Sequence, residues 1–179
     1  MKDFKETREI VFEKEDSYKL LELTNSWIGN MDTKASFLLA YLALVNGFVV
    51  SNGVPSIFSE LPSIPTGVDI WLKKILAIAL YLTLVSSLFL LLGTLTARLK
   101  GNKKKTSLLF FGEIASMSLN DYKAKILNRT EEELIKDVLE QIHTNSLICT
   151  KKSRYYNVGV RVTFIATVLY VVCMWMRIL

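Results

Sequence analysis

The sequence is poor in the residues that build most catalytic and metal centres. His143 is the only histidine among 179 residues, which excludes a metal site built on two histidines. Neither a GxSxG elbow nor a GxxxxGK[ST] loop occurs, so the signatures of a serine hydrolase and of a P-loop are missing. The two cysteines, Cys149 and Cys173, are predicted to be free thiols. We therefore expect no catalytic residues, no metal site, no cofactor and no enzymatic activity.

Charge is absent from three long apolar runs, 35–50, 75–97 and 162–176. The run 75–97 alone supplies the roughly 20 residues that a helix needs to cross a bilayer, and the other two runs approach this length with a few flanking residues. Hydrophobic residues make up 51% of the chain and its mean hydropathy is +0.32, which leaves too little polar chain to cover a soluble core. The expected fold class is an all-α integral membrane protein with three transmembrane helices and a cytoplasmic helical module.

Lysine and arginine are also absent from 51–69, although the far flanks of the two adjoining runs are basic. Because short translocated loops lack basic residues, this asymmetry predicts a cytoplasmic N-terminus and an external C-terminus. The net charge of +5 is explained by these flanks, so no nucleic-acid partner is expected. The expected order is a cytoplasmic N-terminal helix 1–30, a first span 31–52, an extracytoplasmic loop 53–69, a second span 70–98, a cytoplasmic helical sensor module 99–155 and a third span 156–179.

The N-terminal helix carries a modest apolar stripe on a charged background. Its members follow helical spacing: Phe4, Val11, Tyr18, Leu21 and Ile28. Such a stripe needs a partner, which is either the protein's own cytoplasmic helices or a second copy of the chain.

A new helix is expected to start after a break at Asn128 and Arg129. Thr130 and Glu133 have the spacing of a capping box, in which each side chain accepts a hydrogen bond from the other residue's backbone N–H. No proline follows, so the helix either continues directly into the third span or bends within 153–159. The two alternatives remain open.

Several residues in and near the spans are candidates for helix packing and anchoring. Small residues at intervals of four allow close helix approach, and the expected packing set on the second span is Ala79, Thr83, Ser87, Gly93 and Ala97. Where the N-terminal helix meets the membrane, Trp27, Asp32 and Lys34 act either as an interfacial anchor or as a hinge that holds cytoplasmic helices against the spans. No ionisable residue is expected at midspan, which disfavours a transporter or proton pump.

Three segments in this order resemble the transmembrane effectors of Pycsar, a bacterial antiphage system that uses cyclic pyrimidine nucleotides. The first is NSWIGNMDTKAS, which enters the first span with Asn25, Trp27, Ile28, Asp32, Lys34 and Ala35. The second is FFGEI followed by DY, with Phe110, Phe111, Gly112, Ile114 and Tyr122. The third is DVLEQIHTNSLICTKK, with Asp137, Gln141, Ile142, Asn145, Ser146, Ile148 and Lys152. His143 stands where an aromatic residue is more usual in this family.

The resemblance implies a multi-pass protein of the bacterial inner membrane with a signalling role. A partner cyclase would make cyclic CMP or cyclic UMP on infection. The effector, as a homo-oligomer in contact with membrane lipid, would then impair the inner membrane and kill the cell. A phosphodiester and a base call for a cation, amide groups and an aromatic wall. The residues nominated for cyclic-nucleotide binding are Tyr122, Lys123, Lys125, Gln141, Asn145 and Lys152.

Two other classes of function compete with this interpretation. A non-catalytic membrane scaffold or accessory subunit would recruit a partner through its cytoplasmic helices and would not be toxic. A membrane-bound enzyme is disfavoured by the missing site chemistry.

Overall fold

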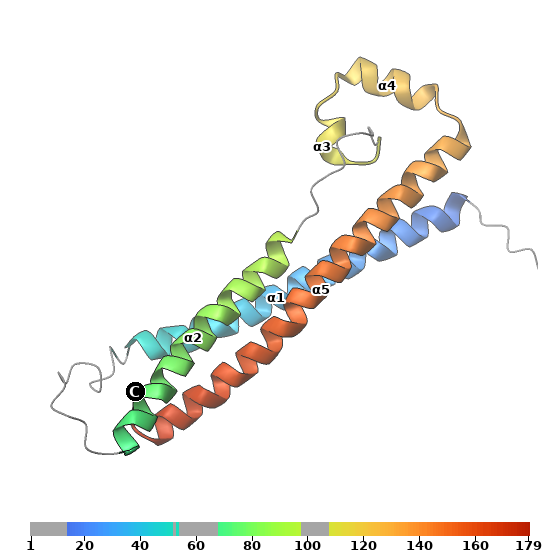
Figure 1. Cartoon of the computed structure of the whole chain (residues 1–179). Helices are drawn as coiled ribbons and strands as arrows, with labels where there is room; N and C mark the ends of the chain where they lie inside the picture. Colours follow the sequence, from blue (N-terminus) through green and yellow to red (C-terminus); the bar gives the residue numbers. More distant parts are fainter. Residues whose placement is uncertain (1–13, 52, 54–67, 98–107) are drawn as a thin grey trace, which may run out of the picture. The chain divides into compact units, whose positions relative to one another are not determined.

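The computed structural model describes residues 14–51, 53, 68–97 and 108–179, and these residues form helices without any strand (Figure 1). In chain order the helices are α1 (Lys14–Ser51), α2 (Val68–Thr96), α3 (Phe111–Ile114), α4 (Leu119–Leu127) and α5 (Glu131–Trp175). The start of the expected sensor module, residues 99–107, and nearly all of the expected outer loop lie outside the described residues. The chain divides into two compact units. The first unit comprises Met1–Trp27 and Leu99–Leu147, and the second unit comprises Ile28–Arg98 and Ile148–Leu179.

Three helices, namely α1, residues Ile70–Thr96 of α2, and α5, are long and apolar enough to cross a membrane. The three spans predicted from the uncharged runs therefore fall on three separate helices. Helix α5 is a single helix from Glu131 to Trp175, which is the continuous one of the two alternatives left open by the sequence. Both cysteines are free thiols, as predicted.

The three helices of the second unit pack along one line of buried residues on each helix, here called the seam. Along the seam, buried positions alternate at spacings of three and four residues. This 3.5-residue period is the pattern of helices that pack as a coiled coil. On α2 the buried positions are Ala77, Leu80, Leu84, Ser87, Leu91 and Thr94. On α5 they are Lys152, Gly159, Thr163, Ala166 and Cys173, and on α1 they are Ala35, Leu42, Val45 and Val49.

Polar contacts across this seam fix the directions of its three helices. Asp32 of α1 contacts Lys152 of α5, and further along both helices Tyr41 bonds Thr167 at 2.9 Å, so α1 and α5 run parallel. Along α2 the order is reversed, because Ser87 bonds Thr163 while the later Leu95 meets the earlier Lys152. The first and third spans therefore begin on one side of the membrane, and the second span begins on the other side.

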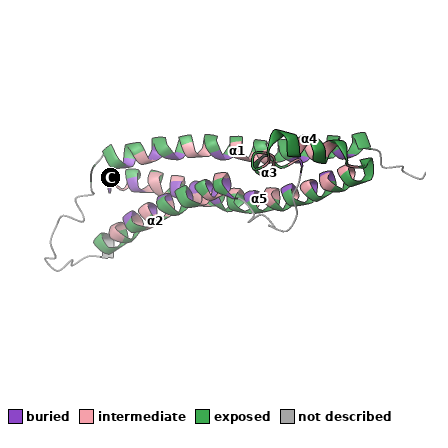
Figure 2. Ribbon diagram, turned by 90° about the horizontal axis from the view of Figure 1, so that it is seen from above, coloured by how far each residue is buried: buried purple, intermediate pink, exposed green. Residues whose placement is uncertain are grey.

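The outward faces of these helices are exposed, as the green ribbon in Figure 2 shows, and they carry large apolar side chains. Phe37 on α1, Phe89 on α2 and Phe164 on α5 are between 68% and 75% exposed. Side chains of this kind are suited to lipid contact, since a bilayer removes the penalty that water would impose on them.

In the first unit, the N-terminal parts of α1 and α5 also run parallel. Lys14 pairs with Glu131 at 3.3 Å, and Asn25 further along α1 accepts a hydrogen bond from Asn145. The buried positions of α1 here are Ser17 and Thr24 rather than the expected Tyr18, which is 39% exposed; Leu21 is half-buried, and Phe4 and Val11 lie outside the described residues. The hydroxyls of Ser17 and Thr24 bond carbonyls of their own helix, so these small side chains are buried without unsatisfied polar atoms.

The start of α5 confirms the predicted capping box. The Thr130 N–H donates to a Glu133 carboxylate oxygen, and the Glu133 N–H donates to the Thr130 hydroxyl, both at 3.3 Å. Helix α4 ends just before, at a C-cap formed by Asn128. The break predicted at Asn128 and Arg129 is therefore a short turn that joins two capped helices.

Candidate functional site

The first unit contains an open hollow at the turn between α4 and α5. Its lining residues are Leu108, Ala124, Lys125, Asn128 and Arg129. The lining thus combines two cationic side chains, Lys125 and Arg129, and the Asn128 amide with the apolar residues Leu108 and Ala124. Lys125 is exposed, its ammonium lies 3.5 Å from the Met117 thioether, and it forms no ion pair with a carboxylate among the described residues.

Asp137 secures this hollow from the second turn of α5. Its carboxylate accepts a hydrogen bond from the Leu108 backbone N–H at 2.9 Å and pairs with the Arg129 guanidinium at 3.1 Å. The Asp137 side chain is 10% exposed, and Leu108 is 1% exposed. The short turn after Asn128 brings Arg129 onto the face of α5 that carries Asp137, so the arginine is held in place while its other N–H groups remain available for an anion.

Removal of the Asp137 carboxylate is expected to loosen the hollow. In Asp137→Ala the buried Leu108 N–H loses its acceptor and Arg129 loses its counter-charge, so the free energy of unfolding should fall by roughly 2 kcal/mol. Hydrogen exchange followed by mass spectrometry should report faster exchange at Leu108. Unchanged exchange at Leu108 would contradict this role, and Glu132→Ala, an exposed first-turn change, serves as the control.

Two nominated ligand residues, Gln141 and Asn145, form a chain of amides with Asn25. The Gln141 amide donates to the Asn145 carbonyl oxygen at 3.2 Å, and the Asn145 amide donates to the Asn25 carbonyl oxygen at 2.7 Å. Asn145 is 8% exposed and faces α1 within the first unit. A buried asparagine at such a position fixes the register of paired helices, which gives Asn145 a structural role in this arrangement.

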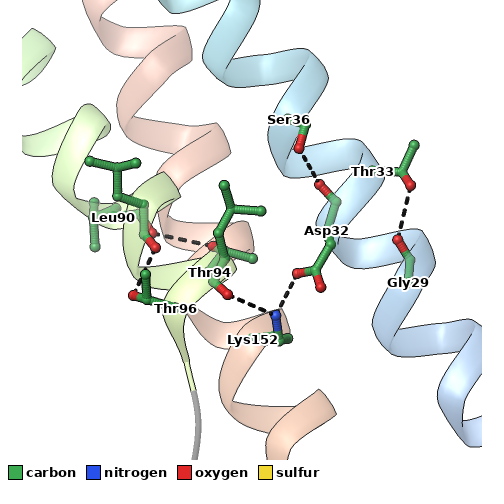
Figure 3. A network of polar contacts seen from close by, with 10 residues as sticks. Gly29, Asp32, Thr33, Ser36, Leu90, Thr94, Thr96 and Lys152 are labelled. Atoms are coloured by element: carbon green, nitrogen blue, oxygen red, sulfur yellow. Dashed lines mark hydrogen bonds and ion pairs between the residues drawn. The ribbon is translucent and has the colours of Figure 1, made fainter.

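The second unit contains a charge pair with a buried lysine that joins all three of its helices (Figure 3). The Lys152 ammonium, on a side chain only 5% exposed, donates to an Asp32 carboxylate oxygen at 2.5 Å and to the Leu95 carbonyl at 3.3 Å. Because α2 ends at Thr96, the Leu95 carbonyl belongs to the last turn and has no partner within its own helix. One lysine therefore satisfies a carboxylate on α1 and a free carbonyl on α2.

The anchor or hinge group is only partly brought together. Asp32 is paired with Lys152, whereas Lys34 is exposed and has no ion pair within the described residues. Trp27 is 47% exposed and belongs to the first unit. The carboxylate at the membrane entrance thus has its partner 120 residues away.

The nominated ligand residues do not gather at one point. Lys125 lines the hollow, Lys123 is exposed and Tyr122 is half-buried on the same helix, Gln141 and Asn145 form the amide chain, and Lys152 is committed to its pair in the second unit. Arg129 and Asn128 complete the hollow, but the sequence marked them only as a helix break. No local pattern indicated their role, since it depends on the pairing of Arg129 with Asp137.

The nominated packing residues lie in and beside the seam of the second unit. The Ser87 hydroxyl is hydrogen-bonded to the Thr163 hydroxyl. A Cβ added at Gly93 would lie 3.3 Å from the ring of Tyr155. Ala97 is 4% exposed. Ala79 and Thr83 are half-buried at the flank, and the Thr83 hydroxyl bonds the Ala79 carbonyl of its own helix at 2.9 Å.

Comparison with known proteins places these features in a family. The family model described as "Pycsar effector protein domain" matches residues 16–177. A Pycsar effector protein of Gulbenkiania mobilis is 31% identical, over 89% of this chain and 90% of that protein. A second Pycsar effector protein, from Propioniciclava tarda, is 24% identical over 86% of this chain and 75% of that protein. No solved structure matches the chain.

Proposed function

The chain belongs to the Pycsar effector family, and from this premise we propose that it binds a cyclic pyrimidine nucleotide in its first unit and then impairs the inner membrane through its second unit. The protein is an antiphage effector and a multi-pass protein of the bacterial inner membrane. The cyclic nucleotide, cyclic CMP or cyclic UMP, is the product of a partner cyclase on the cytoplasmic side.

The observation that supports ligand binding most directly is the cationic hollow. A cyclic nucleotide carries one negative charge on its phosphodiester, and an arginine or lysine is the usual partner for such a group. Lys125 and Arg129 supply these cations, and the Asn128 amide offers hydrogen bonds to a base edge. Tyr122 and Lys123 lie on the same helix, while Gln141 and Asn145 belong to the same unit.

Membrane impairment through a pore requires more than one copy of the chain. The seam of one protomer is filled by Leu42, Leu80, Leu84 and Leu91, each at most 2% exposed, so the water path does not run between its own helices. We therefore include self-association in the proposal. It is tested by cross-linking in native membranes with and without an active cyclase.

Binding is tested by calorimetry on the purified full chain with cyclic CMP and cyclic UMP. One of the two nucleotides is expected to bind, and Lys125→Gln should weaken binding about tenfold, because a charge-assisted hydrogen bond is lost. Lys136→Gln removes the same charge from an exposed position on α5 and should leave the affinity unchanged. A protein that responds to neither nucleotide would contradict the proposed ligand.

The cellular consequence is tested by co-expression with an active cyclase. Growth arrest and loss of membrane potential are expected with the wild-type chain, and Lys125→Gln should delay both. Absence of toxicity together with a stably co-purifying protein would instead favour the scaffold.

A further inference from the structure

The outward face of α5 in the second unit carries two arginines without a protein partner. Arg154 and Arg161 are exposed, and neither guanidinium has a hydrogen bond or ion pair within the described part of the chain. Asn157 lies between them on the same face and is also exposed. The spacings of three and four residues align these side chains in one row along the helix.

Contacts within the second unit show how deep Arg161 lies. Two residues before it, Gly159 packs against Leu91, and two residues after it, Thr163 bonds Ser87. Arg161 is therefore level with the part of α2 between Ser87 and Leu91, well inside the uncharged run 75–97. Nine residues separate it from the paired Lys152, which is about 14 Å at 1.5 Å per residue.

This level falls inside the apolar layer of a bilayer, whose hydrocarbon core is about 30 Å thick. An arginine facing lipid at such a depth is costly, and in known membrane proteins it draws water and phosphate toward itself. Side chains on a helix lean toward its N-terminus, which favours an Arg161 guanidinium directed toward the end of the row with Asn157 and Arg154. The row thus leads from the layer of Arg161 to the head groups of the leaflet at the N-terminal ends of the first and third spans.

Lipid is the source of an anion for Arg161 that the sequence favours. The three uncharged runs, 35–50, 75–97 and 162–176, contain no aspartate or glutamate, so a second copy in the same layer offers no carboxylate at this depth. A phospholipid phosphate, in contrast, matches the two-pronged geometry of a guanidinium and carries the required charge.

We propose that Arg161, Asn157 and Arg154 form a binding site for the phosphate of an anionic phospholipid. The site holds the head group below its usual depth and thins the bilayer beside α5. Lipid binding itself goes beyond the proposed function, whereas its use in membrane impairment rests on that function.

The site is tested on the full chain in detergent, without any nucleotide, by titration with phosphatidylglycerol, phosphatidylcholine or inorganic phosphate. Lipid retention is counted by native mass spectrometry, and the melting temperature is followed in parallel. Phosphatidylglycerol is expected to bind and stabilise the wild-type chain more than the other two. Arg161→Gln should weaken phosphatidylglycerol binding about five- to tenfold, and Arg161→Lys should retain part of it.

Lys136→Gln is the matched control, since it removes the same charge from an exposed residue of the first unit. Circular dichroism establishes that the variants are folded. Equal phosphatidylglycerol binding by Arg161→Gln and wild type would overturn the proposal. Equal stabilisation by inorganic phosphate would also overturn it, because the site would then take soluble anions rather than lipid. Neither result would bear on nucleotide binding.

Discussion

Replacing Asp32 with alanine is expected to destabilise the three-helix seam by roughly 3 kcal/mol. The change leaves the Lys152 ammonium buried with only the Leu95 carbonyl as a partner. An unpaired buried charge costs about 3–5 kcal/mol, and the lower end applies because the Asp32 side chain is 38% exposed. The free energy of unfolding is measured by circular dichroism in mixed micelles with increasing dodecyl sulfate.

Two double variants separate the charge pair from the packing around it. Asp32→Ala with Lys152→Met removes both charges and should recover most of the loss, since an apolar replacement of a buried pair is often neutral. Asp32→Lys with Lys152→Asp reverses the pair and should recover part of it. Lys19→Ala, which breaks an exposed pair with Glu15, should change the free energy by less than about 0.5 kcal/mol. An Asp32→Ala variant as stable as this control would refute the role of the pair.

The three spans and the start of α5 could be predicted because each depends on residues close together in sequence. The uncharged runs 35–50, 75–97 and 162–176 mark the spans without knowledge of any neighbour. The Thr130 and Glu133 capping box likewise needs only a spacing of three. In both cases the physical cause lies within one helix.

The polar pairs across the seams could not be predicted, because they depend on which helices meet and in which register. Asn25 with Asn145 and Asp32 with Lys152 share the same separation of 120 residues. The sequence alone suggests ligand roles for Asn145 and Lys152 and an anchor or hinge role for Asp32, because it does not show which residue of another helix each one meets. The hollow was missed for the same reason, since Arg129 takes its place only through Asp137.

The buried positions of α2 also differ from the packing line predicted from its small residues. Intervals of four pointed to Ala79, Thr83 and Ser87 as one packing line, but the seam alternates three and four residues and retains only Ser87 of them. A supercoiled contact drifts away from a strict interval of four. Among these three residues, the interval of four therefore identified one residue of the seam and two residues at its flank.

Gly159→Leu is expected to separate α2 from α5 and to lower the free energy of unfolding by about 3 kcal/mol. In sequence Gly159 is a weak point of a long helix, whereas in the seam a Cβ there would lie 2.9 Å from a methyl of Leu91, which is fully buried. Overpacking of a tight contact typically costs 1–3 kcal/mol, and leucine adds three further carbons beyond the Cβ. Unfolding in mixed micelles measures the loss.

The matched change is Gly47→Leu in α1, where no atom lies within 4 Å of an added Cβ and the residue faces outward. It should be neutral or stabilising by up to about 1 kcal/mol, because leucine favours a helix more than glycine does. A swap of sizes, Gly159→Leu with Leu91→Gly, should recover part of the loss, since space removed on one helix is returned on the other. If Gly159→Leu and Gly47→Leu behave alike, the close approach of α2 and α5 at this level is wrong, and with it the depth assigned to Arg161.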